Sequence, residues 1–311
     1  MFYKSPSLSR TSSDLPLPSS FSLPNSAICD AMASRNRMPT ALEPYLQLPP
    51  ELSLILLTST LGCSSNWLLC RYIGGLLTAK DGLEGKVSED GTGVETAVVL
   101  VSFTRDAKYW QTELRRTMGV DLGKMGQNGR YSFVDCFTTL AGWRSEAVVG
   151  EIEKWVAAAI RAAREKQRKV VLVLDGPDVL TALANATAHE LNGLLLKLRR
   201  QVHSALLACA ADLPFVSAAI EEHERPTPLG SESAAFIVQQ VHAARMVLSV
   251  RGLATGAAKD VSGVLRLTPG GDVYGDEDRN KGSDVVKGLE ALYFVEGNGN
   301  AQVFERSAGQ M

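Results

Sequence analysis

The chain has 311 residues, of which 45% are hydrophobic, so it is long enough to form a large α/β domain with a packed core. Its 32 Lys and Arg residues nearly balance 34 Asp and Glu residues, which excludes a globally basic nucleic-acid-binding protein. No apolar run reaches the roughly 18–20 residues that cross a bilayer. The five cysteines form no C-x-x-C pair, which argues against a disulfide scaffold or a zinc site.

Residues 1–40 differ in composition from the rest of the chain. They contain ten Ser and five Pro residues and no sustained apolar period. Such a segment cannot bury enough apolar surface to offset its conformational entropy, so we expect a disordered tail. We expect residues 41–311 to form a single domain.

From about residue 50 onward, buried-strand patterns alternate with helical patterns. Five-residue apolar runs predict central strands, and apolar residues at helical spacing predict the intervening helices. The predicted strands are 52–60, 97–103, 130–136, 170–175, 204–211 and 245–252, followed by a meander over 259–268 and 291–306. The predicted helices are 66–79, 107–117, 146–168, 188–202 and 231–243.

This alternation predicts an α/β fold in which a mainly parallel sheet has helices on both faces. The final meander predicts an antiparallel extension at the C-terminal end of the sheet. We also expect Ser64 and Ser65 to cap the first helix, and Lys166, Arg168 and Lys169 to lie at the C-terminal end of the helix over 146–168. Glycine-rich or charged loops are expected at 80–95, 212–230 and 269–288.

Asp175 closes one of the central strands, where a nucleoside triphosphatase places a carboxylate that holds Mg²⁺ or orients water. The phosphate-binding loop that would accompany it, G-x-x-x-x-G-K-[ST], occurs nowhere in the chain. At the expected place, after the first strand, only Gly62 remains, and Asn66-Trp67 stands where Lys-Ser/Thr would be. Two interpretations remain open: a degenerate nucleotide site at Gly62, Asn66 and Asp175, or a turn and helix start that packs Trp67 in the core.

Several cations lie between the second and third predicted strands. Arg105 follows the second strand directly, at the edge of the sheet where ligands bind in open α/β folds. Arg115, Arg116, Lys124 and Arg130 come after it in sequence. They are candidate contacts to RNA phosphates or to a neighbouring subunit, and the alternative is a solvated charged surface. The four histidines show no metal-ligand spacing, and we expect no metal, cofactor or catalytic residue.

An ordered set of segments resembles subunit 6 of the Elongator complex in its fungal form. These segments are LEPYLQLPPE (42–51), LTSTLGCSSNWLL (57–69), VLVSFTRD (99–106), Trp110 with GRYSFVD (129–135), VLVLDGPD (171–178) and KDVSGVLR (259–266). The resemblance covers roughly residues 42–272.

The resemblance implies a RecA-like fold without a phosphate loop. It also implies a non-catalytic role in a hetero-hexameric ring with Elongator subunits 4 and 5. That ring binds tRNA and, with the remaining Elongator subunits, supports modification of wobble uridine at carbon 5. The implied location is cytoplasmic and nuclear. The alternative hypothesis from another class is an active nucleoside triphosphatase or small-molecule kinase with a divergent phosphate loop.

Overall fold

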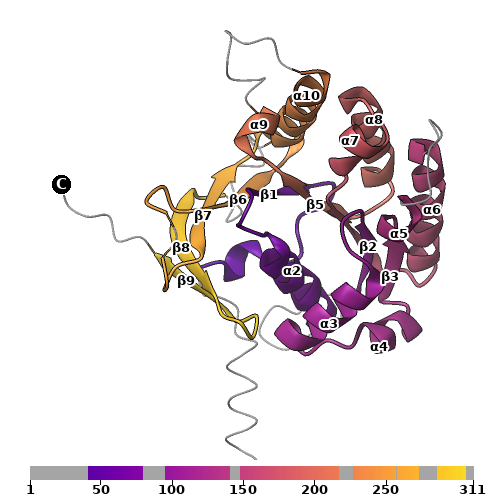
Figure 1. The fold of residues 1–311 in the computed structure, drawn as a ribbon. Coiled ribbons are helices and arrows are strands. Elements are labelled where there is room, and N and C mark those ends of the chain that lie inside the picture. Colours follow the sequence, from indigo (N-terminus) through magenta and orange to yellow (C-terminus); the bar gives the residue numbers. More distant parts are fainter. Residues whose placement is uncertain are drawn as a thin grey trace, which may run out of the picture. The chain divides into compact units, whose positions relative to one another are not determined.

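The computed structural model describes residues 41–79, 95–140, 148–216, 227–256, 258–272 and 286–305. The predicted tail at 1–40 lies outside these ranges, as do most of the predicted loops at 80–95 and 269–288. Figure 1 labels the elements, which are η1 (Glu43–Tyr45), β1 (Leu54–Ser59), α2 (Asn66–Thr78), β2 (Thr96–Ser102), α3 (Ala107–Met118), α4 (Leu122–Gln127), β3 (Tyr131–Asp135), α5 (Phe137–Leu140), α6 (Val148–Arg164), β4 (Lys169–Asp175), α7 (Val179–Leu183), α8 (Ala188–Arg199), β5 (Ser204–Ala210), α9 (Leu213–Val216), α10 (Pro228–Ala243), β6 (Met246–Arg251), β7 (Gly263–Pro269), β8 (Leu289–Val295) and β9 (Ala301–Glu305).

The strands of the described residues form one sheet in the order β3-β2-β4-β5-β1-β6-β7-β8-β9. The strands from β3 to β6 pair in parallel, and β7, β8 and β9 add antiparallel pairs at one side. The apolar runs of β1, β2, β4 and β5 are buried almost end to end, as expected for parallel strands covered on both faces. This topology confirms the predicted α/β fold with a mainly parallel sheet and an antiparallel C-terminal extension.

Two apolar layers lie on opposite faces of the sheet. Because successive side chains of a strand point to opposite faces, Leu54 and Leu56 join one layer while Ile55 and Leu57 join the other. The first layer packs against α6, α8 and α10, and the second packs against α2 and α3. Figure 1 shows these two groups of helices on either side of the strands.

The helix predicted over 146–168 is shorter than expected. It ends at Arg164, and Gln167 adopts a left-handed φ of 55° that turns the chain toward β4. The prediction that Lys166, Arg168 and Lys169 lie at the helix end is therefore wrong. Lys166 Nζ and Arg168 Nη1 donate instead to the carbonyl oxygen of Asn128, at 3.2 and 3.0 Å, and tie this turn to the loop before β3.

Several short helices lie in segments where the sequence pattern predicts no helix. They are α4, α5, α7 and α9, each between four and six residues long. The predicted loop at 212–230 holds α9 and also the start of α10, where Thr227 Oγ1 accepts from the Gly230 N–H at 3.0 Å. A helix of one turn has too few residues to show an apolar period, so pattern alone does not reveal it.

The cysteines of the described residues are free and buried: Cys63, Cys70, Cys136 and Cys209. Burial raises the pKa of the Cys70 and Cys136 thiols to about 12, so both are uncharged at neutral pH. No group of three or more metal-ligating side chains gathers within the described ranges. These thiols therefore act as small apolar core residues.

We expect Gly270→Ala to destabilise the domain. A Cβ at Gly270 would lie 2.7 Å from the carbonyl carbon of Ala244, and the Gly270 N–H donates to the Arg245 carbonyl oxygen at 2.9 Å. The backbone on both sides must then move, so the free energy of unfolding should fall by about 1–3 kcal/mol in urea denaturation. Gly297→Ala is the control, because a Cβ there would meet no atom within 4 Å, and it should change stability by less than about 0.5 kcal/mol. Equal losses in the two variants would contradict this packing.

Candidate functional site

A small cavity of about 160 Å³ lies at the carboxyl edge of the parallel strands. This is the edge at which ligands bind in open α/β folds, because loops from several strands converge there. Its walls come from the loops that follow β1, β2, β4 and β5, and from the first residue of α2. The lining residues are Ser59, Ser64, Ser65, Asn66, Thr104, Arg105, Asp175, Gly176, Asp178, Val179, Ala208, Cys209 and Ala210.

The loop between β1 and α2 is a tight turn. Thr60 and Cys63 form an isolated bridge around Gly62, which has a φ of 85° and open space where a Cβ would point. Trp67 is buried and stacks on Tyr293, with ring centroids 5.2 Å apart, as the packing interpretation of Asn66-Trp67 predicts. The loop thus connects β1 to a helix anchored in the core.

The expected serine caps are only partly present. Ser65 occupies the N-cap position of α2 but makes no side-chain cap hydrogen bond. The neighbouring Ser64 Oγ accepts instead from the Asn66 N–H at 3.2 Å. One hydroxyl therefore satisfies one of the free N–H groups at the start of this helix.

Arg105 reaches from the loop after β2 to the start of α2. With the Asn66 amide oriented so that its oxygen faces donors, Oδ1 accepts from Arg105 Nη2 at 2.9 Å and from Tyr109 Oη at 2.9 Å. The guanidinium carbon lies 4.7 Å from the centre of the Tyr109 ring, a cation–π distance. Arg105 Nη1 also donates to Thr104 Oγ1 at 3.1 Å. Arg105 therefore lies beside the start of α2, which is the place where a phosphate-binding loop would hold a phosphate.

Asp175 is 5% exposed and accepts two hydroxyl hydrogen bonds on one oxygen. Ser102 Oγ donates to Asp175 Oδ2 at 2.8 Å, and Thr104 Oγ1 donates to the same atom at 2.6 Å. These bonds fasten the loop after β2 to the end of β4. The next residue, Gly176, has a φ of 72°, and a Cβ there would collide with the Thr104 methyl group. The carboxylate thus helps to fix the wall of the cavity.

The sequence pattern does not indicate Asp178 as a site residue, although it lies three residues after Asp175. Its Oδ2 accepts from the Ala210 N–H at 3.2 Å, and its Oδ1 is buried without a hydrogen-bond partner among the described residues. Burial, with a smaller contribution from the nearby Asp175, raises the pKa of this carboxyl to about 6. Local pattern does not reveal this burial, because it depends on the end of β5.

The five predicted basic contact residues have different surroundings. Arg105 lies at the cavity, whereas Arg130 donates to the carbonyl oxygens of Thr96 and Leu76, each at 3.3 Å. Arg116 Nη1 donates to the Gly297 carbonyl oxygen at 2.6 Å, and its Nη2 lies 2.7 Å from Glu113 Oε2.

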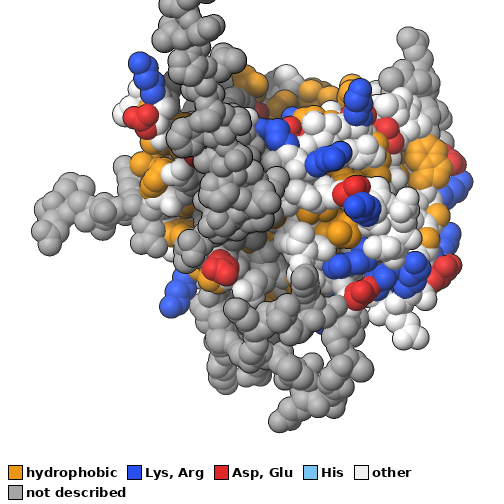
Figure 2. All heavy atoms as spheres, turned by 90° about the horizontal axis from the view of Figure 1, so that it is seen from below, with side chains coloured by type: hydrophobic (Ala, Val, Ile, Leu, Met, Phe, Trp, Pro, Cys, Tyr) orange, Lys and Arg blue, Asp and Glu red, His pale blue; other side chains and the backbone are white. Residues whose placement is uncertain are grey.

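Arg115 and Lys124 are exposed, on α3 and α4. Figure 2 shows a face of the molecule on which blue Lys and Arg side chains alternate with red Asp and Glu side chains. No helix of the described residues is long and apolar enough to cross a membrane.

We expect the stability of the chain relative to its Asp178→Asn variant to depend on pH. The folded-state pKa of about 6 lies above the ordinary value of 3.8, so the Asp178 contribution is fully present below about pH 4 and is lost as the pH rises through 6. In urea denaturation, the free energy of unfolding of Asp178→Asn should therefore rise by about 1–3 kcal/mol relative to that of the wild type between pH 4 and 7. The difference should stay at that level at higher pH. A difference that stays constant across this range would show that Asp178 ionises normally.

No protein-family model matches the sequence, and no curated protein matches it. Among solved structures, the chain is similar to the KaiC-like protein PH0186 from the hyperthermophilic archaeon Pyrococcus horikoshii OT3, at 16% sequence identity and a TM-score of 0.48. The match covers 86% of this chain and 97% of that one. A likeness at this level assigns no activity.

Proposed function

We propose that this chain is a non-catalytic subunit of an Elongator-type assembly, in which it joins subunits 4 and 5 in a hetero-hexameric RecA-like ring. The ring would bind tRNA and support modification of wobble uridine at carbon 5. The proposal rests on the resemblance of residues 42–272 to subunit 6 and on the arrangement at the carboxyl edge of the sheet.

The observation that carries the non-catalytic role is the position of Arg105. Phosphoryl transfer depends on positioning and on charge neutralisation by a loop lysine and a metal ion. Here the start of α2 offers Asn66 in place of that lysine, and the Asn66 side chain is engaged with Arg105 and Tyr109. The Asp175 oxygen that faces the loop after β2 accepts from two hydroxyl groups. This arrangement disfavours the alternative of an active triphosphatase or kinase.

Exposed leucines support a partner surface at the same end of the sheet. Leu61 is 93% exposed and its N–H donates to Asp212 Oδ1 at 2.7 Å, beside Leu213, which is 64% exposed on α9. Leu183 on α7 is 66% exposed, and α7 and α9 both contact α10. Figure 1 shows α7, α9 and α10 near one another on one side of the sheet. Exposed apolar groups that lie together are typical of protein–protein contacts.

Assembly tests the proposal directly. Replacing Leu183 and Leu213 together by glutamate should reduce co-purification with subunits 4 and 5 at least tenfold, because charge is placed in an apolar contact. Phe304→Glu is the control, because Phe304 is 44% exposed but lies on β9, the last strand in the sheet order. Melting curves of the isolated variants would confirm that both remain folded.

Three outcomes would count against the proposal. The first is a wild-type chain that does not co-purify with the two subunits. The second is normal assembly of the variant at Leu183 and Leu213, and the third is an equal loss of assembly in Phe304→Glu.

A further inference from the structure

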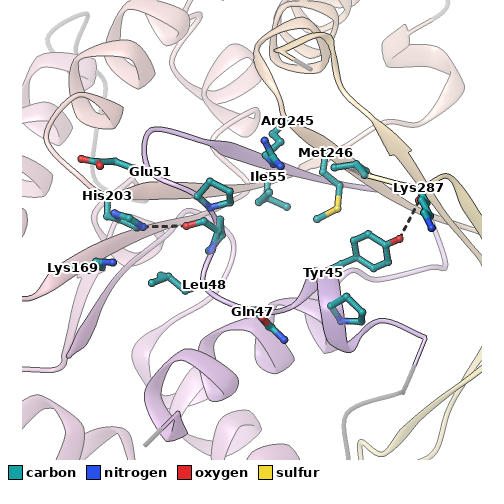
Figure 3. Close-up of a pocket in the computed structure, with 14 residues that line it drawn as sticks. Tyr45, Gln47, Leu48, Glu51, Ile55, Lys169, His203, Arg245, Met246 and Lys287 are labelled. Atoms are coloured by element: carbon teal, nitrogen blue, oxygen red, sulfur yellow. Dashed lines mark hydrogen bonds between the residues drawn. The ribbon is translucent and has the colours of Figure 1, made fainter. Parts of the chain in front are cut away.

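A second and larger cavity, of about 740 Å³, lies at the opposite edge of the sheet (Figure 3). It is formed where the amino ends of β1, β4, β5 and β6 meet the segment that precedes β1. Its volume is within the range of ligand-binding cavities in proteins, about 300–1,000 Å³. The carboxyl-edge cavity and the predicted contact residues make no part of it.

The walls of this amino-edge pocket are held by hydrogen bonds. Tyr45 Oη donates to the Lys287 carbonyl oxygen at 3.3 Å, and the buried Tyr72 Oη donates to the Tyr45 carbonyl oxygen at 2.6 Å. Ser53 Oγ donates to the Pro50 carbonyl oxygen at 2.6 Å, and His203 Nε2 lies 3.1 Å from the Pro49 carbonyl oxygen. The segment before β1 is therefore fastened at several points, so the pocket exists before any ligand arrives.

Positive charge is spread around the rim. Figure 3 shows Lys169 beside His203 on one side, Lys287 beside Tyr45 on the other, and Arg245 between them. Lys169 Nζ and Lys287 Nζ form no hydrogen bond or ion pair with the described residues, and both side chains are exposed. Glu51 is the acidic side chain in the lining. The rim therefore attracts anions.

The spacing of these cations indicates the length of the anion. Lys169 begins β4 and Lys287 precedes β8, which lies five strands away in the sheet order. Neighbouring strands lie about 4.8 Å apart, so the two lysines are separated by roughly 20–25 Å. A phosphate ion or a mononucleotide is too short to reach both. A chain of anions at regular intervals, such as a nucleic-acid backbone, is long enough.

The floor of the pocket is apolar and one wall is aromatic. Ile55 and Met246 are buried beneath it, and Leu48 and the Tyr45 ring line its sides. Single-stranded nucleic acids bind through cations that contact phosphates and through aromatic or apolar surfaces that receive unstacked bases. Gln47 is exposed at the rim and offers an amide that can pair with a base edge.

We propose that the amino-edge pocket binds a single-stranded nucleic-acid segment, with Lys169 and Lys287 on backbone phosphates several nucleotides apart and an unstacked base against Tyr45 and Met246. This site deepens the proposed function, on which it rests, by placing an RNA contact on this chain. It lies within one chain and does not require the ring, so it can fail while assembly with subunits 4 and 5 succeeds.

The test is fluorescence anisotropy of the full chain with a labelled single-stranded oligouridine of about 12 nucleotides, across a salt series. Lys169→Ala with Lys287→Ala should weaken binding about tenfold or more and reduce the salt slope by about 1.4, because each single-strand phosphate contact contributes about 0.7. Lys154→Ala with Lys197→Ala is the matched control, because these exposed lysines lie on α6 and α8. It should leave both affinity and slope unchanged.

Two further ligands distinguish a nucleic-acid strand from other anions. Uridine monophosphate should compete far more weakly than the oligouridine, because it spans too little of the rim. An oligoglutamate of equal charge should also compete weakly, because it carries no base for the apolar floor. The proposal is overturned if the wild type does not bind the oligouridine, if the control variant loses as much affinity, or if either competitor displaces it equally well.

Discussion

Burial of the central strands on both faces determines where polar chemistry can lie in this chain. Along β1, β4 and β5 almost every side chain is apolar and packed against one of the two helix layers. Polar groups along these strands therefore concentrate where the strands end, because an unpaired polar group inside the sheet would cost about 1–3 kcal/mol or more. The carboxyl-edge cavity and the amino-edge pocket both lie at such ends, one at each edge of the sheet.

The two edges differ in how far the chain satisfies its own polar groups. At the carboxyl edge, Asp175 accepts from Ser102 and Thr104, and Arg105 contacts Asn66 and the Tyr109 ring. The exception there is Asp178, whose buried Oδ1 has no hydrogen-bond partner among the described residues. At the amino edge, Lys169 and Lys287 form no ion pair with the described residues. At the edge where catalytic α/β proteins hold their ligand, Arg105 and Asp175 are thus engaged by neighbouring side chains, while the other edge presents two lysines without an ion pair among the described residues.

The sequence predicts the sheet well because its strands are long apolar runs and its main helices keep a clear period. The strands around Leu54–Ser59 and Lys169–Asp175 and the helix Asn66–Thr78 lie within a few residues of their predicted bounds. Prediction fails where a tertiary contact decides the outcome. The helix before β4 stops early because Gln167 takes a left-handed conformation, and α7 and α9 are too short to show a period.

The candidate sites are harder to predict for the same reason. Asp178 is buried by the end of β5. The amino-edge pocket brings together Lys169, Arg245 and Lys287 from three distant segments. The local sequence pattern therefore predicts neither feature.

We propose that the carboxyl edge does not catalyse phosphoryl transfer, because the lysine of a phosphate-binding loop is absent there. Steady-state ATP turnover by the purified chain, with Mg²⁺ present, tests this central claim most directly. We predict no turnover above that of an Asp175→Ala variant, because the phosphate-binding lysine is absent. Arg105 and Asp175 line the cavity, but neighbouring side chains of the same chain engage both of them. Sustained turnover by the wild-type chain that Asp175→Ala abolishes would contradict the claim and would favour an active triphosphatase.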